Sequence, residues 1–593
     1  MTFLRPADKP PCWRPLWLCL CLACSTGATA WGIEIKQNSE VWGFNRQILP
    51  DRFNILTVTA INAGPEPFEG MLELQHGSRI SRSGEIMRVP VYLAPGEERF
   101  VQFYPYLSSL GTNEDWTVTW PKGSYDLRPP REYKVEGKRV GIWLEDARTI
   151  SNTKGGLPGF SADLFPPFST ATDTLQLVAI DEAPRWDQPR RQAFMEWLYR
   201  GGELHLYHDS NGAYPPFTGE LSVLNSPLER QPLGQGVVIR HPQRRGEGTS
   251  PLEPPKPKPG VSNNRQFDFA QDQIDSDIQR ALRKMVDPQH LWPLIWVMAG
   301  VYLLCVFPGA YLLGRKTRDY RLVFALEFGI AILFSWGFSV VGRRGYNETS
   351  TNSAVALARP VSSEAWDVTL LTNVFVTTGG DYDLSHPGRG VLFATGESGG
   401  GGDRVRGYSQ SGTEAVLHVD IPPFSSRFLR CKAQVKHPGL TLQLAPSAEG
   451  GGAFELIPGP NWPKEVTFIN ALQGGTLYTL KLQGQRFVIL TNNPVQAYMD
   501  RQPDYSSRFQ QTRPFEPKPK VDEDRIFQGL QETLLRQAAL EWNHERESDP
   551  KNNLVRALIF APMPEPFFVK NPRVGKSAGR VMYVLDLTPS GAP

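Results

Sequence analysis

Two long uncharged runs in the middle of the chain constrain its fold more than any other feature. Residues 291–314 carry no formal charge, and residues 322–342 carry only Glu327. Each run reaches the roughly 20 residues that a helix needs to cross a bilayer. We therefore expect two transmembrane helices, over 291–314 and 322–342, that divide the chain into two large extramembrane parts.

A short basic segment between the two runs bears on their orientation. Four of the seven residues in 315–321 are Lys or Arg, and basic residues in short loops favour the cytoplasmic side of a membrane. Basic residues also flank the outer ends of both runs, so the loop over 315–321 does not decide the orientation by itself.

The first thirty residues decide the orientation because they are typical of a secretory signal peptide. Three basic residues precede an apolar run from Leu16 to Ala23, and an Ala-x-Ala ending follows at Ala30. An uncleaved anchor and a lipid-modified start at Cys24 are the alternatives to cleavage of residues 1–30. With the start of the chain exported, two spans return it outside. Both large parts are therefore expected on the extracytoplasmic side of a bacterial inner membrane.

Cysteine content and charge narrow the class of protein. Four of the six cysteines lie in 1–30, and Cys431 alone belongs to an exported part, so no intrachain disulfide framework is possible. Lys and Arg exceed Asp and Glu by 63 − 61 = 2, a balance that excludes a basic nucleic-acid binder. The exported parts must therefore be stabilised by apolar cores.

Residues 31–135 have the pattern of short β-strands. Apolar residues alternate with period two in 53–61 and 98–104, and Gly and Pro residues at 64–67 and 95–96 mark turns. Short strands at this spacing predict a β-sandwich of immunoglobulin-like size.

The pattern changes in residues 136–245. Continuous apolar strands are predicted at 139–144, 175–181, 203–208 and 233–240, with a helix at 188–200. Strands of this kind that alternate with a helix predict an α/β domain whose parallel sheet is covered on both faces.

The order strand, Asp-x-x-Pro, helix, Trp-x-x-x-Gly-Gly, strand in this part resembles the class I glutamine amidotransferase-like domain of bacterial envelope proteins. The resemblance is carried by Ile180, Asp181, Pro184, Phe194, Trp197, Gly201, Gly202 and Leu204. Catalytic members of that superfamily have a Cys on a sharp turn after the third strand, whereas this chain has Asp-Ser-Asn-Gly at 209–212. The resemblance therefore implies an amidotransferase-like fold without the catalytic Cys.

The remaining exported segments are predicted as a linker, helices and a β domain. Residues 246–288 combine a Pro-rich linker with a juxtamembrane helix at 266–285. Residues 343–593 form a β-rich domain with a sandwich at 350–495 and an amphipathic helix at about 523–545. Its strands are expected at 368–378, 413–419, 441–444 and 476–490, with closing strands at 555–560 and 580–587 that pair with the sandwich.

The apolar runs add a second resemblance. The segment from Tyr302 to Leu313, with Phe-Pro-Gly-Ala-Tyr at its centre, precedes the basic loop and a helix that ends Gly-Arg-Arg-Gly at 342–345. This arrangement resembles a family of uncharacterised two-span bacterial envelope membrane proteins that are found beside genes for MoxR-type ATPases. The resemblance implies an exported β domain, an amidotransferase-like domain, the hairpin and a β-rich tail, with a MoxR-type system as the partner.

Glu327 is the candidate for a functional contact inside the membrane. An acidic side chain in a bilayer is costly and normally faces protein rather than lipid. Counted from the cytoplasmic ends, it lies level with 308–311 of the first run. We expect Glu327 to bond Tyr311, a backbone carbonyl freed by Pro308, or a partner's helix. A protonated Glu near the interface is the alternative.

Asp181 and Glu182 are the candidates for a ligand-binding crevice. They stand at the carboxyl end of a predicted strand, where open α/β sheets bind ligands. An Asp at this position also caps a following helix or turn, which is the alternative. His205 and His208 point to opposite faces of one strand and predict no metal pair. Asp381, Asp383 and Asp403 lack the spacing of a calcium loop, so no metal or cofactor is predicted.

The sequence thus predicts a multidomain envelope protein with a β-sandwich, an α/β domain, a two-helix hairpin and a C-terminal sandwich-like domain. The leading hypothesis is a membrane-anchored scaffold or binding protein without catalysis. Its expected partners are the lipid bilayer and other envelope proteins, and no nucleic acid. The alternative is an envelope enzyme that uses the α/β domain on a wall-related or small-molecule substrate.

Overall fold

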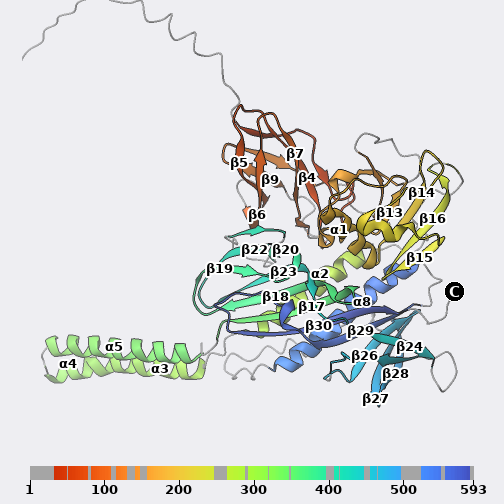
Figure 1. Ribbon diagram of the computed structural model, residues 1–593. Helices are drawn as coiled ribbons and strands as arrows, with labels where there is room; N and C mark the ends of the chain where they lie inside the picture. The colour runs from red at the N-terminus through yellow and green to blue at the C-terminus, as the bar shows by residue number, and fades with distance from the viewer. Residues whose placement is uncertain are drawn as a thin grey trace, which may run out of the picture.

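The computed structural model describes most of the chain. The described residues are 32–49, 51–77, 82–107, 115–129, 140–146, 157–245, 247, 264–286, 292–317, 320–345, 349–395, 407–412, 414–446, 454–463, 465–495, 522–548 and 554–587. The predicted signal peptide with Cys24, the Pro-rich stretch 248–263 and Asp403 lie outside these ranges. The chain is a multidomain, mostly-β protein with several sheets and two long apolar helices (Figure 1).

Two sheets enclose the N-terminal core. The first contains β1 (Ile33–Ile35), β2 (Val41–Trp42), β4 (Leu56–Asn62) and β7 (Glu98–Phe103). The second contains β5 (Phe68–Gly77), β6 (Arg82–Leu93), β9 (Trp116–Trp120) and β10 (Gly123–Leu127). Val58 of the first sheet and Leu74 of the second belong to one buried cluster, because alternate residues of each strand point inward. A short pair, β3 (Arg52–Phe53) with β8 (Tyr106–Leu107), forms a separate two-stranded sheet.

The second N-terminal sheet continues into the C-terminal half of the chain. Strand β6 pairs in parallel with β21 (Gly407–Gln410), with Met87 opposite Ser409. The sheet then continues through β22 (Val416–Ile421) to β19 (Gly380–Ser385). Segments that precede and follow the two apolar helices are therefore joined by backbone pairing.

The α/β part is a mixed sheet with the strand order β12-β11-β13-β14-β16-β15. Its strands are β11 (Gly141–Glu145), β12 (Gly159–Ser161), β13 (Leu177–Ile180), β14 (Glu203–His208), β15 (Arg230–Leu233) and β16 (Gly236–Arg244). All neighbours are parallel except β15 and β16, which are antiparallel. The predicted parallel sheet is confirmed as the main part of this mixed sheet.

Helix α1 (Gln188–Tyr199) packs on one face of the parallel strands. Phe194 and Leu198 lie in one buried cluster with Ile142, Val178 and Leu204. Short 3₁₀ turns complete this part at η1 (Ala162–Leu164), η2 (Ser169–Thr172) and η3 (Gly219–Asn225).

The strand predicted at 233–240 is confirmed in part as β16, which begins at Gly236 because a tight turn at 234–235 joins it to β15. Gly234 has a φ of +62°, and a Cβ at this position would lie 2.7 Å from the carbonyl oxygen of Tyr199. The turn therefore requires glycine at 234.

The largest sheet has eleven strands in the order β20-β23-β18-β17-β30-β29-β26-β27-β28-β25-β24. The strands are β17 (Thr351–Ser362), β18 (Ala365–Val376), β20 (Arg389–Thr395), β23 (Ser425–Lys436), β24 (Leu442–Pro446), β25 (Phe454–Pro458), β26 (Phe468–Gln473), β27 (Thr476–Gln483), β28 (Arg486–Pro494), β29 (Val555–Pro562) and β30 (Lys576–Leu587). A 3₁₀ turn, η5 (Glu565–Phe567), precedes β30.

The expected return of the closing strands is confirmed. β30 pairs in parallel with β17 and antiparallel with β29, so the last described strand lies inside the sheet. The strand predicted at 476–490 is instead a hairpin of β27 and β28, because Gly484 with a φ of +64° allows a tight turn.

Two amphipathic helices cover part of this sheet. They are α2 (Asn264–Lys284) and α8 (Glu523–Ser548). Ile278 of α2 and Leu530 and Leu534 of α8 share a buried cluster with Val355 and Leu371 of the sheet. The helix predicted at 523–545 is confirmed, and α2 brings the chain to this sheet before the apolar helices begin.

The two apolar helices lie side by side and extend away from the remaining structure (Figure 1). The first consists of α3 (Trp292–Leu304), the π-helical segment η4 (Cys305–Ala310) and α4 (Tyr311–Thr317), and the second is α5 (Tyr320–Gly345). The spans Leu294–Lys316 and Arg321–Val341 are long and apolar enough to cross a membrane. Both helices continue into the segment 315–321 that was expected to be a loop, and Pro308 interrupts the first one.

Candidate functional site

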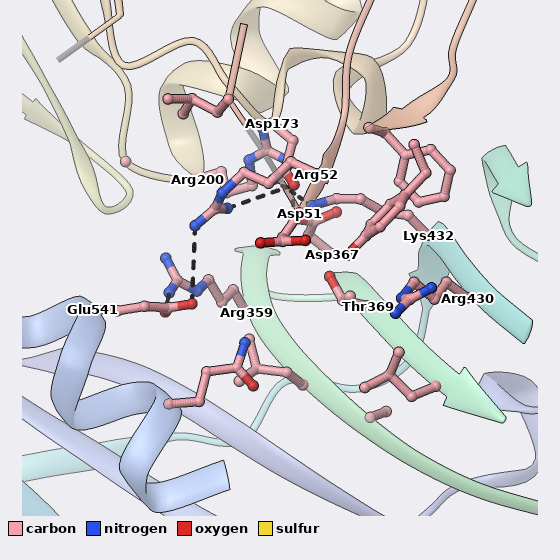
Figure 2. A pocket seen from close by; sticks show the side chains of 18 of the residues that line it. Asp51, Arg52, Asp173, Arg200, Arg359, Asp367, Thr369, Arg430, Lys432 and Glu541 are labelled. Carbon is pink, nitrogen blue, oxygen red and sulfur yellow. Dashed lines mark hydrogen bonds and ion pairs between the residues drawn. The ribbon is translucent and has the colours of Figure 1, made fainter. Parts of the chain in front are cut away.

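A cavity of about 260 Å³ lies where the N-terminal, α/β and C-terminal parts meet (Figure 2). We call it the junction cavity. Its floor is formed by β17, β18 and β23 of the eleven-stranded sheet, and the end of α1 lies on the opposite side. Residues of β3, β8, α2 and α8 complete the lining.

The alternation of strand residues builds the polar floor of the cavity. Asp367, Thr369 and Leu371 of β18 are two residues apart, so they share one face of the sheet. Arg359 of β17 lies opposite Asp367, and Lys432 of β23 lies opposite Thr369. The register of three strands therefore places Arg359 and Lys432 on the same face of the sheet as the buried Asp367.

The Trp-x-x-x-Gly-Gly motif places Arg200 against this floor. The Trp197 ring packs directly on Gly202, where a Cβ would lie 2.6 Å from the ring, and its Nε1 donates a 2.8 Å hydrogen bond to the carbonyl oxygen of Leu175. This contact fixes the end of α1 beside the loop that carries Asp173. Arg200, directly after the last turn of α1, then reaches across to the eleven-stranded sheet.

Buried ion pairs connect the three parts of the chain. Arg200 Nη1 lies 2.8 Å from Asp367 Oδ2, and Lys432 Nζ lies 3.4 Å from the same oxygen. Lys432 also donates a hydrogen bond to Asp173, and Arg52 of β3 lies 3.6 Å from Asp173. One network thus joins β3, the α/β part, β18 and β23.

Two further pairs extend the network along the cavity. Glu541 of α8 pairs with Arg359 at 2.6 Å and lies 4.0 Å from Arg52. On the other side, Arg430 pairs with Asp275 of α2 at 3.1 Å, and the Tyr106 hydroxyl donates to Asp275 at 3.3 Å. Both helices that cover the sheet are therefore tied to it by charge as well as by apolar contact.

The pairing keeps the buried groups ionised. Burial favours a raised pKa for Asp173, but the charges of Lys432 and of two arginines outweigh burial and hold that pKa well below its usual range. Burial opposes ionisation of Glu541 as well, and Arg359 and Arg52 lower its pKa. Burial favours a lower pKa for Arg200, but its two acidic partners raise that pKa. These groups stay charged at neutral pH, so their arrangement suits electrostatic binding rather than proton transfer.

The lining of the cavity is balanced in charge. Five side chains are basic, namely Arg52, Arg200, Arg359, Arg430 and Lys432. Five are acidic, namely Asp51, Asp173, Asp275, Asp367 and Glu541. Sequence reasoning missed this set because its members come from segments far apart in the chain. The only sign of this set in the local sequence was a charged residue within an apolar strand, such as Lys432.

The predicted crevice residues lie at the switch point of the α/β sheet. Numbered in chain order, the six strands are arranged 2-1-3-4-6-5, so the strand order reverses between β11 and β13. Asp181 follows β13, and Glu145 ends β11 with its Oε1 2.5 Å from Arg245 Nη1. The N-cap of α1 is Asp187, so Asp181 does not cap that helix.

The surroundings of Asp181 perturb its ionisation. Burial raises its pKa, the charge of Arg245 opposes the rise, and Glu182 and Glu145 add to it. The structure therefore brings Asp181 and Glu182 into one electrostatic neighbourhood with Glu145 and Arg245. The sequence analysis did not name these last two residues, although Glu145 directly follows a predicted strand.

The histidines and aspartates considered for metal binding have other contacts. His205 Nδ1 lies 2.8 Å from His241 Nε2, whereas the His208 ring packs against Tyr214. Asp383 contacts His418. Within the described residues no group of three or more His, Cys, Asp or Glu could hold a metal ion.

The intramembrane candidates lie on the two apolar helices. Glu327 is half-buried on α5, Pro308 lies in η4, and Tyr311 is exposed with its ring 5.9 Å from that of Phe307. No hydrogen bond from Glu327 to Tyr311 or to a carbonyl near Pro308 is present among the described residues. The contact stays a prediction.

The fold and the junction define a mostly-β protein in which three parts of the chain meet at a charged cavity. No protein-family model and no curated protein matches this chain. A cycloisomaltooligosaccharide glucanotransferase of Paenibacillus sp., solved in complex with cycloisomaltoheptaose, is similar at 8% identity and a TM-score of 0.15, over 71% of each chain.

A β-glucuronidase of glycoside hydrolase family 2 is similar at 8% identity and a TM-score of 0.12, over 95% of this chain and 62% of its own. Both TM-scores are too low to indicate a shared fold, so neither likeness bears on function.

Proposed function

We propose that this protein is a membrane-anchored, extracytoplasmic scaffold or binding protein of the bacterial cell envelope that performs no catalysis. The pairing of β6 with β21 carries the proposal. Segments that share a sheet must lie in one compartment, because a bilayer admits no lipid-exposed sheet edges. The parts before and after the apolar helices then form one body, and the helical hairpin serves as its anchor.

The buried ion pairs support a structural role for this body. Breaking such pairs is costly, so the network at Asp173, Asp367 and Lys432 holds the α/β part against the eleven-stranded sheet. A rigid body of this size on one side of a membrane suits the display of binding surfaces. We propose other envelope proteins, including a MoxR-type ATPase system, as its partners.

The α/β part is proposed to be an amidotransferase-like module that has lost its chemistry. At the turn after β14, where the catalytic members have Cys, the Asp209 carboxylate accepts hydrogen bonds from the backbone N–H groups of Asn211 and Ala213 at 2.8 and 3.0 Å. These bonds lower the pKa of Asp209, with the Ala213 bond contributing most. The turn is thus held by a carboxylate in a structural role.

A disulfide test examines the shared compartment directly. Met87 and Ser409 lie opposite each other on neighbouring strands, whose spacing suits a disulfide. The double variant Met87→Cys with Ser409→Cys should form a disulfide in intact membranes, whereas Met87→Cys with Ser577→Cys should not. Absence of the bond in the first pair would overturn the single-body proposal. Crosslinking of the same membranes then identifies attached proteins, and recovery of MoxR-type components would support the partner assignment.

The convergence of Glu145, Asp181 and Arg245 at the switch point favours an envelope enzyme as the second candidate. Its test is complementation of a strain that lacks the protein. Loss of function with Asp181→Asn, in a variant that still forms the Met87–Ser409 crosslink, would favour the enzyme. Full function would favour the scaffold.

A further inference from the structure

The junction cavity contains polar atoms that its ion pairs leave unused. Asp367 is 6% exposed, and its Oδ1 has no hydrogen-bond partner although Oδ2 pairs with Arg200 and Lys432. The Nε of Arg430 is also buried without a partner. Buried polar groups are normally hydrogen-bonded, so these two atoms indicate a missing acceptor and a missing donor.

The cavity is large enough for a small molecule and has a mouth. Its volume is about 260 Å³, close to the lower end of the range for ligand pockets. The Arg52 side chain is 40% exposed and marks the open side, whereas Asp367 and Lys432 on the floor are buried. Figure 2 shows Thr369 on the floor beside Asp367 and Arg430, with no ion pair drawn to it.

The chemistry of the lining selects one class of ligand. Five basic and five acidic side chains balance, so a ligand with a net charge would leave one charge uncompensated in a buried site. An apolar ligand would leave Asp367 Oδ1 and Arg430 Nε unpaired. A compact molecule with a cationic end for Asp367 and an anionic end for Arg430 satisfies both atoms, and Phe53 and Trp197 offer it apolar walls.

We propose that the junction cavity binds a small zwitterion of the amino-acid class and acts as a ligand-dependent joint. The lining comes from three parts of the chain, so the complete site exists only when these parts are assembled. A ligand that binds only the assembled state stabilises that state by mass action. Occupancy of the cavity would thereby tighten the contact between the α/β part and the eleven-stranded sheet.

The test uses the purified full chain in detergent and a panel of small probes at one concentration. Alanine and glutamine should raise the unfolding temperature and give heat on calorimetric titration. Acetate lacks the cationic end, methylammonium lacks the anionic end, and glycerol has neither charge. None of the three should raise the unfolding temperature or give heat on titration. Binding of glycerol as tight as that of alanine, or no response to either zwitterion, would overturn the inference. Either of these two results would leave the outcome of the disulfide test, which examines the proposed scaffold, unaffected.

A matched pair of variants locates the binding. Thr369→Met fills the cavity from its floor without removing an ion pair, and it should weaken binding of glutamine at least about tenfold. Thr476→Met, at the start of β27 and outside the lining, should leave binding unchanged. Equal binding by both variants would show that the zwitterion binds elsewhere and would overturn the assignment. The panel with the unaltered chain tests the ligand class even where a variant folds poorly.

Discussion

The sheet-containing body and the two apolar helices follow opposite rules of burial. The Lys432 side chain is 4% exposed in the body, whereas Phe324 on α5 is 70% exposed. A lysine is buried only where acids such as Asp173 and Asp367 pair with it. A row of exposed aromatic and aliphatic side chains is stable only where the solvent is not water. The contrast is what we expect of a chain folded for two solvents, with water around the body and lipid around the helices.

The largest expected effect comes from breaking the buried network at its centre. Lys432→Met leaves Asp173 without its nearest cation and Asp367 with one cation fewer. The body should lose about 3–5 kcal/mol of unfolding free energy, measured by denaturant unfolding followed by Trp fluorescence. Lys36→Met is the matched control, because the ion pair of Lys36 with Glu98 is about half exposed and should cost less than about 1 kcal/mol. Equal losses in both variants would show that the network does not hold the body together.

A second substitution tests the solvent around the helices. Leu333 on α5 and Leu490 on β28 are exposed to similar extents, 60% and 56%. Arginine at the centre of a membrane helix costs about 2.5–3.5 kcal/mol, so Leu333→Arg should sharply reduce the membrane-integrated fraction. Leu490→Arg should change stability by less than about 0.5 kcal/mol if water surrounds the body. An unchanged membrane-integrated fraction in Leu333→Arg would indicate that water, and not lipid, surrounds α5.

A buried group that burial keeps neutral gives the body a pH dependence. His386 Nδ1 accepts a 3.0 Å hydrogen bond from the Gly388 N–H, and its Nε2 lies 3.2 Å from the carbonyl oxygen of Phe567. Burial lowers the pKa of His386 from 6.5 to about 4. The unfolded chain therefore binds a proton before the folded one does. The body should keep its full stability above pH 6.5 and lose about 3 kcal/mol as the pH falls to 4.

The histidine responsible can be identified by substitution. In His386→Gln the loss of stability between pH 6.5 and 4 should shrink by about 3 kcal/mol, because the titrating group is gone. His208→Gln alters a half-buried histidine of β14 and should retain the original pH dependence. Denaturant midpoints at several pH values measure both. If the stability of His386→Gln falls with pH as steeply as that of the unaltered chain, other groups cause the effect.

Local periodicity was enough to predict much of the fold. The apolar helices, α1, α8 and the parallel strands were predicted because their hydrophobic patterns repeat within one segment. The hairpins at Gly234 and Gly484 were missed, although polar residues beside each glycine already mark a turn between two apolar stretches.

The site depends on pairings that no local pattern contains. Lys432 and Asp173 are 259 positions apart, and Met87 meets Ser409 across the whole apolar hairpin. The contact of Lys432 with Asp173 depends on the register of β18 and β23 and on how α1 docks against that sheet, and the contact of Met87 with Ser409 depends on the pairing of β6 with β21. The sequence placed Asp181 and Glu182 at a strand end, but not beside Glu145 and Arg245, for the same reason.

The smallest expected effect concerns Glu327, the one acid on the apolar helices between residues 322 and 342. Polar contacts inside a membrane contribute about 1 kcal/mol, and about 1 kcal/mol corresponds to roughly fivefold in a binding constant. If Glu327 meets a partner's helix, Glu327→Leu should reduce the recovery of that partner about fivefold. Glu327→Gln should retain most of it, because the amide still donates and accepts hydrogen bonds. Unchanged membrane yield and partner recovery in both variants would show that Glu327 makes no functional contact. The hairpin would then be an anchor only, and all recognition would belong to the body.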